Sequence, residues 1–352
     1  MSESPEKLRE DAGNYFQETL NLMRSGKPEE ALESLQKAEE AAQQAKADDI
    51  LLHVMNIRGQ LMLSIGALDE ALKICGHASN LFAEILTQNP ENDFVLQCLQ
   101  MNLNNVGIAG NHFESMGHFP QAKDAYETGL SISQKMLDFL PQDDFCIIYT
   151  ANTLNNLGSL LFDMGSVEEA KEKYEKALEI YEELLKTDPE NAEYQSDVAM
   201  TLNNLGTLLS DTGNLEEAKE KYETSLEIYE ALLKTDPENA GYQSFVETTL
   251  NNLGNLLSDM GSTEEAKEKY EKALGIYENL LETDPENELY LDTFRITLNN
   301  LGTLFSKKGQ KEEAKEYFEK ALDILKILSE KDPENEKLKE EIRLTQKELE
   351  TL

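Results

Sequence analysis

Asparagine pairs recur at a constant interval in the second half of the chain and are the residues best suited to bind another molecule. They are Asn155-Asn156, Asn203-Asn204, Asn251-Asn252 and Asn299-Asn300. Each pair interrupts a segment with helical spacing, where asparagine is unfavourable, so its recurrence needs an explanation. A carboxamide carries both a donor and an acceptor, so it can bind the amide and carbonyl groups of a peptide. Two alternatives stay open: each pair bonds to a neighbouring helix, or it persists from a recent duplication.

A charged residue follows each asparagine pair at the same interval. It is Asp163, Asp211 or Asp259 after the first three pairs, and Lys307 after the fourth. The residues between, one helical turn after each pair, are uncharged: Ser159, Thr207, Asn255 and Thr303. The sequence therefore predicts an uncharged strip with an acidic margin, which favours a neutral or basic segment of a partner.

The chain offers little for catalysis or metal binding. Its four histidines include no HExxH motif, and Cys75-x-His77 places its two side chains on different sides of a helix. Paired acids are abundant, but a glutamate-rich helix face produces them by chance. We recognise no Ser/His/Asp set. The sequence therefore predicts no catalytic residue, no metal site and no cofactor, and hence a protein that is not an enzyme.

A repeat of 48 residues positions these side chains. The motif TLNNLG begins at Thr153, Thr201, Thr249 and Thr297, and a DPEN motif follows each time. The unit that begins at Thr153 matches the next one at 36 of 48 positions. Its apolar residues recur at steps of three and four, which predicts two amphipathic helices per unit.

The ends of these helices have recognisable signals. Ser166, Asn214 and Ser262 each precede a glutamate by three residues, which predicts a capping box at the start of the second helix. The next first helix is expected to begin at Pro189 with Asp188 as its cap, and to end at Gly213.

The repeat resembles the tetratricopeptide repeat. Leu154-x-x-Leu157-Gly158-x-x-Leu161, followed by Ala170, Tyr174 and Ala177, is similar to that family's signature, with leucine in place of the usual tryptophan. The family period is 34 residues, so these units are lengthened and resemble the repeats of kinesin light chain, which also carry a leucine-asparagine-asparagine-leucine run. The resemblance implies an all-α, right-handed superhelical solenoid of antiparallel helix pairs. It also implies that the first helices line a concave groove that the asparagines face.

The same frame extends over nearly the whole chain. The small residue at the predicted helix crossing recurs as Ala31, Ala71, Ala122, Ala170, Ala218, Ala266 and Ala314. We therefore predict seven helix pairs that form one solenoid over residues 1–333, and a capping helix over residues 334–352, because solenoid ends need a cover.

The charge balance excludes several partners. Lys and Arg total 32 against 69 Asp and Glu, a net charge of −37. Nucleic acids and anionic membranes attract basic surfaces, so neither is expected. The three cysteines are sparse and odd in number, and the N-terminal residues lack the apolar core of a signal peptide, so we expect a cytoplasmic protein.

These features predict a scaffold or adaptor that binds a peptide segment or helix of an unidentified protein in its groove. The alternative is an architectural protein that self-associates through its solenoid surfaces or its termini. A concentration series in light scattering distinguishes the two.

Overall fold

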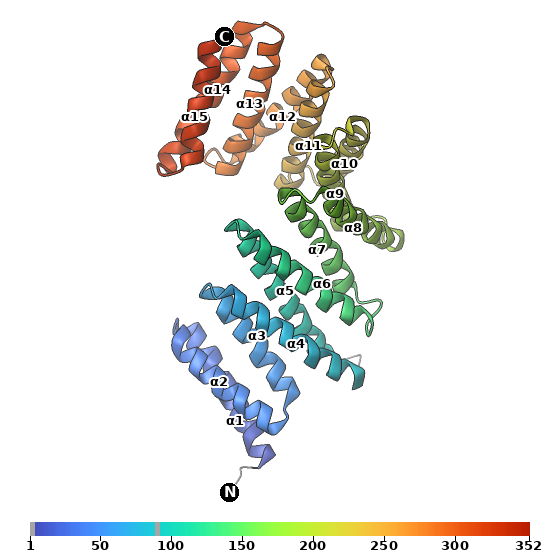
Figure 1. Ribbon diagram of the computed structural model, residues 1–352, viewed down its shortest axis with the longest axis vertical. Coiled ribbons are helices and arrows are strands. Elements are labelled where there is room, and N and C mark those ends of the chain that lie inside the picture. Colours follow the sequence, from blue (N-terminus) through green and yellow to red (C-terminus); the bar gives the residue numbers. More distant parts are fainter. Residues whose placement is uncertain (1–3, 89–91) are drawn as a thin grey trace. The chain divides into compact units, whose positions relative to one another are not determined.

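The computed structural model describes residues 4–88 and 92–352, and the described part contains helices and no strand. The chain divides into two compact units, Met1–Tyr181 and Glu182–Leu352. The division falls inside α8 (Val167–Thr187), which begins in the first unit and ends in the second. Figure 1 shows the helices in chain order.

The first unit stacks helix pairs. Its helices are α1 (Pro5–Arg24), α2 (Pro28–Ala45), α3 (Asp48–Ser64), α4 (Leu68–Gln88), α5 (Asp93–Ser115), α6 (Phe119–Leu137), α7 (Asp144–Asp163) and the beginning of α8. Helix α1 packs on α2, α3 on α4 and α5 on α6, and α1, α3, α5 and α7 also contact one another in succession. This is the arrangement of a helical repeat array, in which a hairpin buries its apolar face against its neighbours.

The second unit follows the same plan. Its helices are α9 (Ala192–Asp211), α10 (Leu215–Thr235), α11 (Ala240–Asp259), α12 (Thr263–Thr283), α13 (Glu288–Lys307), α14 (Lys311–Lys331) and α15 (Glu336–Thr351). The first helices α9, α11 and α13 contact one another in succession, and α15 packs against α14. That residues 1–333 make one solenoid and 334–352 its cap stays a prediction.

Glycine lets the two helices of each pair approach closely. A Cβ on Gly206 would lie 2.8 Å from the ring of Tyr222, and one on Gly254 would lie 2.6 Å from the ring of Tyr270. Each ring is only 2% exposed. The predicted close crossing is therefore present, and the residue that occupies the space over the glycine is the tyrosine of the second helix.

The turn inside each pair ends the first helix as predicted but starts the second differently. Gly213 has a φ of +80°, and the amide of Asn214 donates to the Leu209 carbonyl at 2.9 Å, which closes a glycine C-cap. The predicted capping box is wrong at Asn214 and Ser262, whose side chains make no cap hydrogen bond. Their ψ angles are near 60° rather than in the extended region that side-chain capping uses.

The DPEN motif is a turn, so the predicted helix start at Pro189 is wrong. Helix α9 begins at Ala192, and its cap is Asn191. The Asn191 carboxamide accepts from the amides of Glu193 and Tyr194, both at 3.1 Å, and donates to Asp188 at 3.2 Å. Proline suits the second position of such a turn, and asparagine caps as well as aspartate does. Equivalent caps are Asn239, Asn287 and Asn335.

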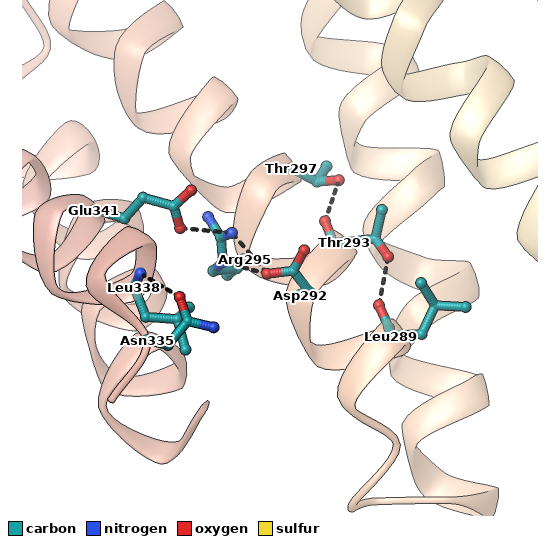
Figure 2. A network of polar contacts seen from close by, with 8 residues as sticks. All are labelled: Leu289, Asp292, Thr293, Arg295, Thr297, Asn335, Leu338 and Glu341. Atoms are coloured by element: carbon teal, nitrogen blue, oxygen red, sulfur yellow. Dashed lines mark hydrogen bonds and ion pairs between the residues drawn. The ribbon is translucent and has the colours of Figure 1, made fainter. Parts of the chain in front are cut away.

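A buried arginine joins α13 to α15 in the second unit. Figure 2 shows Arg295 of α13 between Asp292 of the same helix and Glu341 of α15. Its guanidinium lies 2.6 Å from the Asp292 carboxylate and 2.7 Å from that of Glu341, and its side chain is 6% exposed. Pairing compensates for the burial of this charge and ties α15 to α13.

Candidate functional site

The asparagine pairs lie in the second half of α7, α9, α11 and α13. In two of the four pairs the members differ in exposure, because successive residues lie 100° apart around the helix. Asn155 and Asn251 are buried, at 3% and 5% exposure. The second members are all partly exposed: Asn156, Asn204, Asn252 and Asn300. The first members Asn203 and Asn299 are partly exposed as well. Another molecule could therefore reach all four second members but not Asn155 or Asn251.

Carboxamide hydrogen bonds connect successive first helices in the second unit. Nδ2 of Asn252 donates to Oδ1 of Asn203 at 3.3 Å, and Nδ2 of Asn300 donates to Oδ1 of Asn251 at 3.0 Å. The sequence left open that each asparagine pair bonds to a neighbouring helix. These bonds account for part of the recurrence of asparagine in successive repeats. They use one N–H hydrogen of Asn252 and of Asn300, so the carbonyl oxygen and the second hydrogen of each remain for other contacts.

A similar set of bonds lies in the first unit, between α3 and α5, and sequence reasoning missed it. Asn102 donates to Oδ1 of Asn56 at 3.3 Å, and Asn105 donates to the Asn56 backbone carbonyl at 3.2 Å. All three side chains are buried. The run Leu103-Asn104-Asn105-Val106 is a degenerate copy of the repeat motif and could have indicated them.

The uncharged residues one turn further on bond to their own hairpin. Tyr222 donates to Thr207 at 3.0 Å, and Tyr270 donates to Asn255 at 2.6 Å. Burial raises the pKa of Tyr222 to about 12, so its hydroxyl keeps its proton. In the fourth repeat a phenylalanine, Phe318, replaces the tyrosine, and Thr303 has no such partner among the described residues.

The acidic residues stand at the last position of three first helices. Asp163, Asp211 and Asp259 end α7, α9 and α11, and Lys307 ends α13. All four side chains are exposed, and within the described part of the chain none of them forms an ion pair. Their charges are therefore available to a partner.

One hollow brings several of these predicted residues together in the second unit. It lies between α11 and α13 and has a volume of about 350 Å³. Its lining residues are Asn255, Ser258, Asp259, Tyr270, Asn300, Thr303 and Lys307. Every one of these side chains can donate or accept a hydrogen bond, so the hollow is a polar binding surface.

A family model of the tetratricopeptide repeat matches residues 149–231 and 245–327, the part of the chain that carries the asparagine pairs. Both matched ranges consist of tetratricopeptide repeats. Such repeats are typically non-enzymatic scaffolds through which proteins bind other proteins.

Two solved structures with TM-scores above 0.5 have a similar fold. BtubC (BKLC) from P. vanneervenii is 21% identical, with a TM-score of 0.56 over 75% of this chain and 92% of that chain. The apo form of RapI is 16% identical, with a TM-score of 0.53 over 90% of this chain and 76% of that chain. A Podosopora anserina putative kinesin light chain with nearly identical TPR-like repeats is 18% identical, with a TM-score of 0.47 over 65% and 96%. No curated protein sequence matches the chain.

The cysteine thiols of the chain are buried. Cys75, Cys98 and Cys146 are free thiols, and burial raises the pKa of Cys75 to about 12 and that of Cys98 to about 11. A thiol with a raised pKa carries little thiolate and is a weak nucleophile. In the described part of the chain no group of three or more His, Cys, Asp or Glu could hold a metal ion. None of the described helices is long and apolar enough to cross a membrane.

Proposed function

We propose that this protein is an interaction scaffold or adaptor that binds a peptide segment or helix of another protein along its first helices. The observation that supports this most directly is the unused hydrogen-bonding capacity of Asn252 and Asn300. Both side chains are partly exposed, and each keeps a free carbonyl oxygen and one N–H after its bond to the preceding helix. A donor and an acceptor on the same side chain match the backbone of a peptide.

The bonds between asparagines help rather than oppose this role. They hold the carboxamides of α9, α11 and α13 in one orientation, so less side-chain freedom is lost when a partner binds. Repetition on successive helices offers the same pair of groups to successive stretches of a bound segment. The asparagine pairs therefore serve both the stacking of repeats and the proposed binding surface.

The charges on this surface set the kind of partner. Asp211 and Asp259 are exposed and unpaired within the described residues, and the net charge of the chain is −37. These charges attract a basic segment and do not repel a neutral one, whereas they repel an acidic segment over most of the surface. The sparse, odd and buried cysteines favour a cytoplasmic protein, and self-association stays a prediction from the sequence.

The test first selects peptides that bind this protein from a displayed library of random 12-residue sequences. One selected peptide is then labelled with a fluorophore, and its affinity for the protein is measured by fluorescence anisotropy. The double variant Asn204→Ala/Asn252→Ala is expected to weaken binding at least about tenfold, or about 1.4 kcal/mol. Because Asn252 also bonds to Asn203, circular dichroism and thermal unfolding check that the variant folds.

A second variant keeps the test decisive if the asparagine variant does not fold. Asp211→Lys/Asp259→Lys changes exposed residues and leaves the carboxamide bonds intact. Its control is Glu227→Lys/Glu230→Lys, which changes the charge equally at exposed positions of α10. We expect the aspartate variant to lose the peptide and the control to keep it. Equal binding by both variants and the parent protein contradicts the proposal.

A further inference from the structure

We infer that the surface between α11 and α13 selects its peptide by charge order, with a basic side chain at Asp259 and a carboxylate at Lys307. The inference rests on the proposed function and names the chemistry of the partner. It starts from the hollow of about 350 Å³, which has Asp259 on one helix and Lys307 on the next.

Lys307 is a reversal of charge at a fixed position of the repeat. The three earlier repeats have Asp163, Asp211 and Asp259 there. Neither Asp259 nor Lys307 has an ion-pair partner among the described residues, and both are exposed. An ammonium group and a carboxylate that line one hollow without pairing to each other are both free to pair with a ligand that carries the opposite charges.

The floor between these charges fits one peptide unit. Oδ1 of Asn255 accepts the Tyr270 hydroxyl hydrogen at 2.6 Å, which leaves the Nδ2 donor unused. Nδ2 of Asn300 donates to Asn251 at 3.0 Å, which leaves its Oδ1 acceptor unused. A peptide carbonyl can therefore accept from Asn255 on α11 while the peptide N–H donates to Asn300 on α13.

The end near Lys307 has a further donor for a carboxylate. In the earlier repeats a tyrosine hydroxyl engages the residue that corresponds to Thr303, for example Thr207 with Tyr222. Phe318 lacks that hydroxyl, so the hydroxyl of Thr303 has no partner among the described residues. A hydroxyl donor together with an ammonium group suits a carboxylate better than a neutral side chain.

The spacing of the helices limits the separation of the two charges in the ligand. Packed helix axes lie about 8–10 Å apart, and an extended chain rises about 3.3 Å per residue. The basic side chain and the carboxylate are therefore expected two to three positions apart. Because the charges at the two ends of the hollow are opposite in sign, they also fix the direction in which the bound segment lies.

The experiment compares peptides selected from a displayed library of random 12-residue sequences by three proteins. They are the parent chain, the charge-swapped variant Asp259→Lys/Lys307→Asp, and the control Lys315→Asp/Glu319→Lys, which swaps an exposed pair on α14. All three carry the same net charge, so a general electrostatic effect cancels. Circular dichroism checks that each variant keeps its helices.

The parent chain and the control are expected to enrich peptides with a basic and an acidic residue two to three positions apart in one order. The charge-swapped variant is expected to enrich the opposite order and to bind a parent-selected peptide at least about tenfold more weakly. Enriched peptides without a charge order, or with the same order for all three proteins, overturn the inference and leave the proposed function standing. The absence of any enriched peptide contradicts both.

Discussion

Glu247 of α11 is an acid at a position where two earlier repeats have alanine. The corresponding residues are Ala151 and Ala199. The Glu247 side chain is 0% exposed, and neither carboxylate oxygen has a hydrogen-bond partner among the described residues. Burial raises the pKa of this carboxyl to about 9, and the adjacent Thr248 acts weakly in the opposite direction. The folded chain therefore holds this group in its neutral, protonated form near neutral pH.

The raised pKa predicts how stability depends on pH. Between pH 4.5, the ordinary pKa of a glutamate, and about pH 9 the folded state binds this proton while the unfolded state has released it. The contribution of Glu247 to stability is therefore full below about 4.5 and falls as pH rises, by up to about 1.4 kcal/mol per pH unit. Glu247→Gln removes the titration, so its stability advantage over the parent is expected to grow from pH 5 to pH 9.

Urea unfolding at pH 5, 7 and 9 measures this difference. Glu230→Gln, at an exposed position of α10, controls for the loss of one acidic group and should follow the pH profile of the parent. If the Glu247→Gln profile runs parallel to that of the parent, the carboxyl does not take up a proton on folding.

At the scale of the helix, the turn between repeats has a side-chain cap and the turn inside a repeat has none. Asn239 caps α11 through a bond from the Tyr242 amide at 3.1 Å and also donates to Asp236 at 3.0 Å. Asn214 precedes α10, but its side chain makes no cap bond. Asn239→Ala is therefore expected to lower the free energy of unfolding by about 1 kcal/mol.

Asn214→Ala is the matched variant and is expected to cost clearly less. Chemical denaturation of both single variants and the parent measures the two values. Equal losses at the two positions would show that side-chain capping does not distinguish the turns.

The sequence predicts the helix pairs well because their signal is local and repeated. The interval between the TLNNLG motifs, the apolar stripe and Gly213 specify a hairpin whose close crossing is confirmed. The residue that caps the first helix of each repeat is harder to predict. The DPEN motif contains two good cap residues, Asp188 and Asn191, and the turn that selects between them depends on the whole motif.

The candidate site was predictable only in part, because its contacts depend on register between repeats. Asn300 and Asn251 are 49 residues apart, and no local pattern shows which carboxamide of one helix meets which of the next. The same holds for Arg295, whose counterparts include Ala199 and Glu247, and whose partner Glu341 lies on another helix. A period of 48 identifies equivalent residues but does not specify contacts between helices.

At the scale of the whole molecule, the excess of negative charge opposes folding. The chain has 69 acidic and 32 basic residues. Many of its ion pairs are exposed and lie within one helix, such as Lys176 with Glu172 at 2.6 Å and Lys320 with Glu316 at 2.7 Å. Exposed pairs of this kind contribute between about 0 and 1 kcal/mol each, whereas compaction brings the unpaired carboxylates together.

Salt should therefore stabilise the protein. The Debye length falls from about 30 Å at 0.01 M to about 8 Å at 0.15 M, so repulsion between distant carboxylates is screened first. We expect the Tm to rise between 10 and 150 mM NaCl, by about 1–2 °C for each kcal/mol of repulsion removed. Glu227→Lys/Glu230→Lys lowers the net negative charge and should show a smaller rise. A Tm that stays constant or falls with salt means that the exposed ion pairs outweigh the repulsion, and the acidic surface would then need another explanation, such as its basic partner.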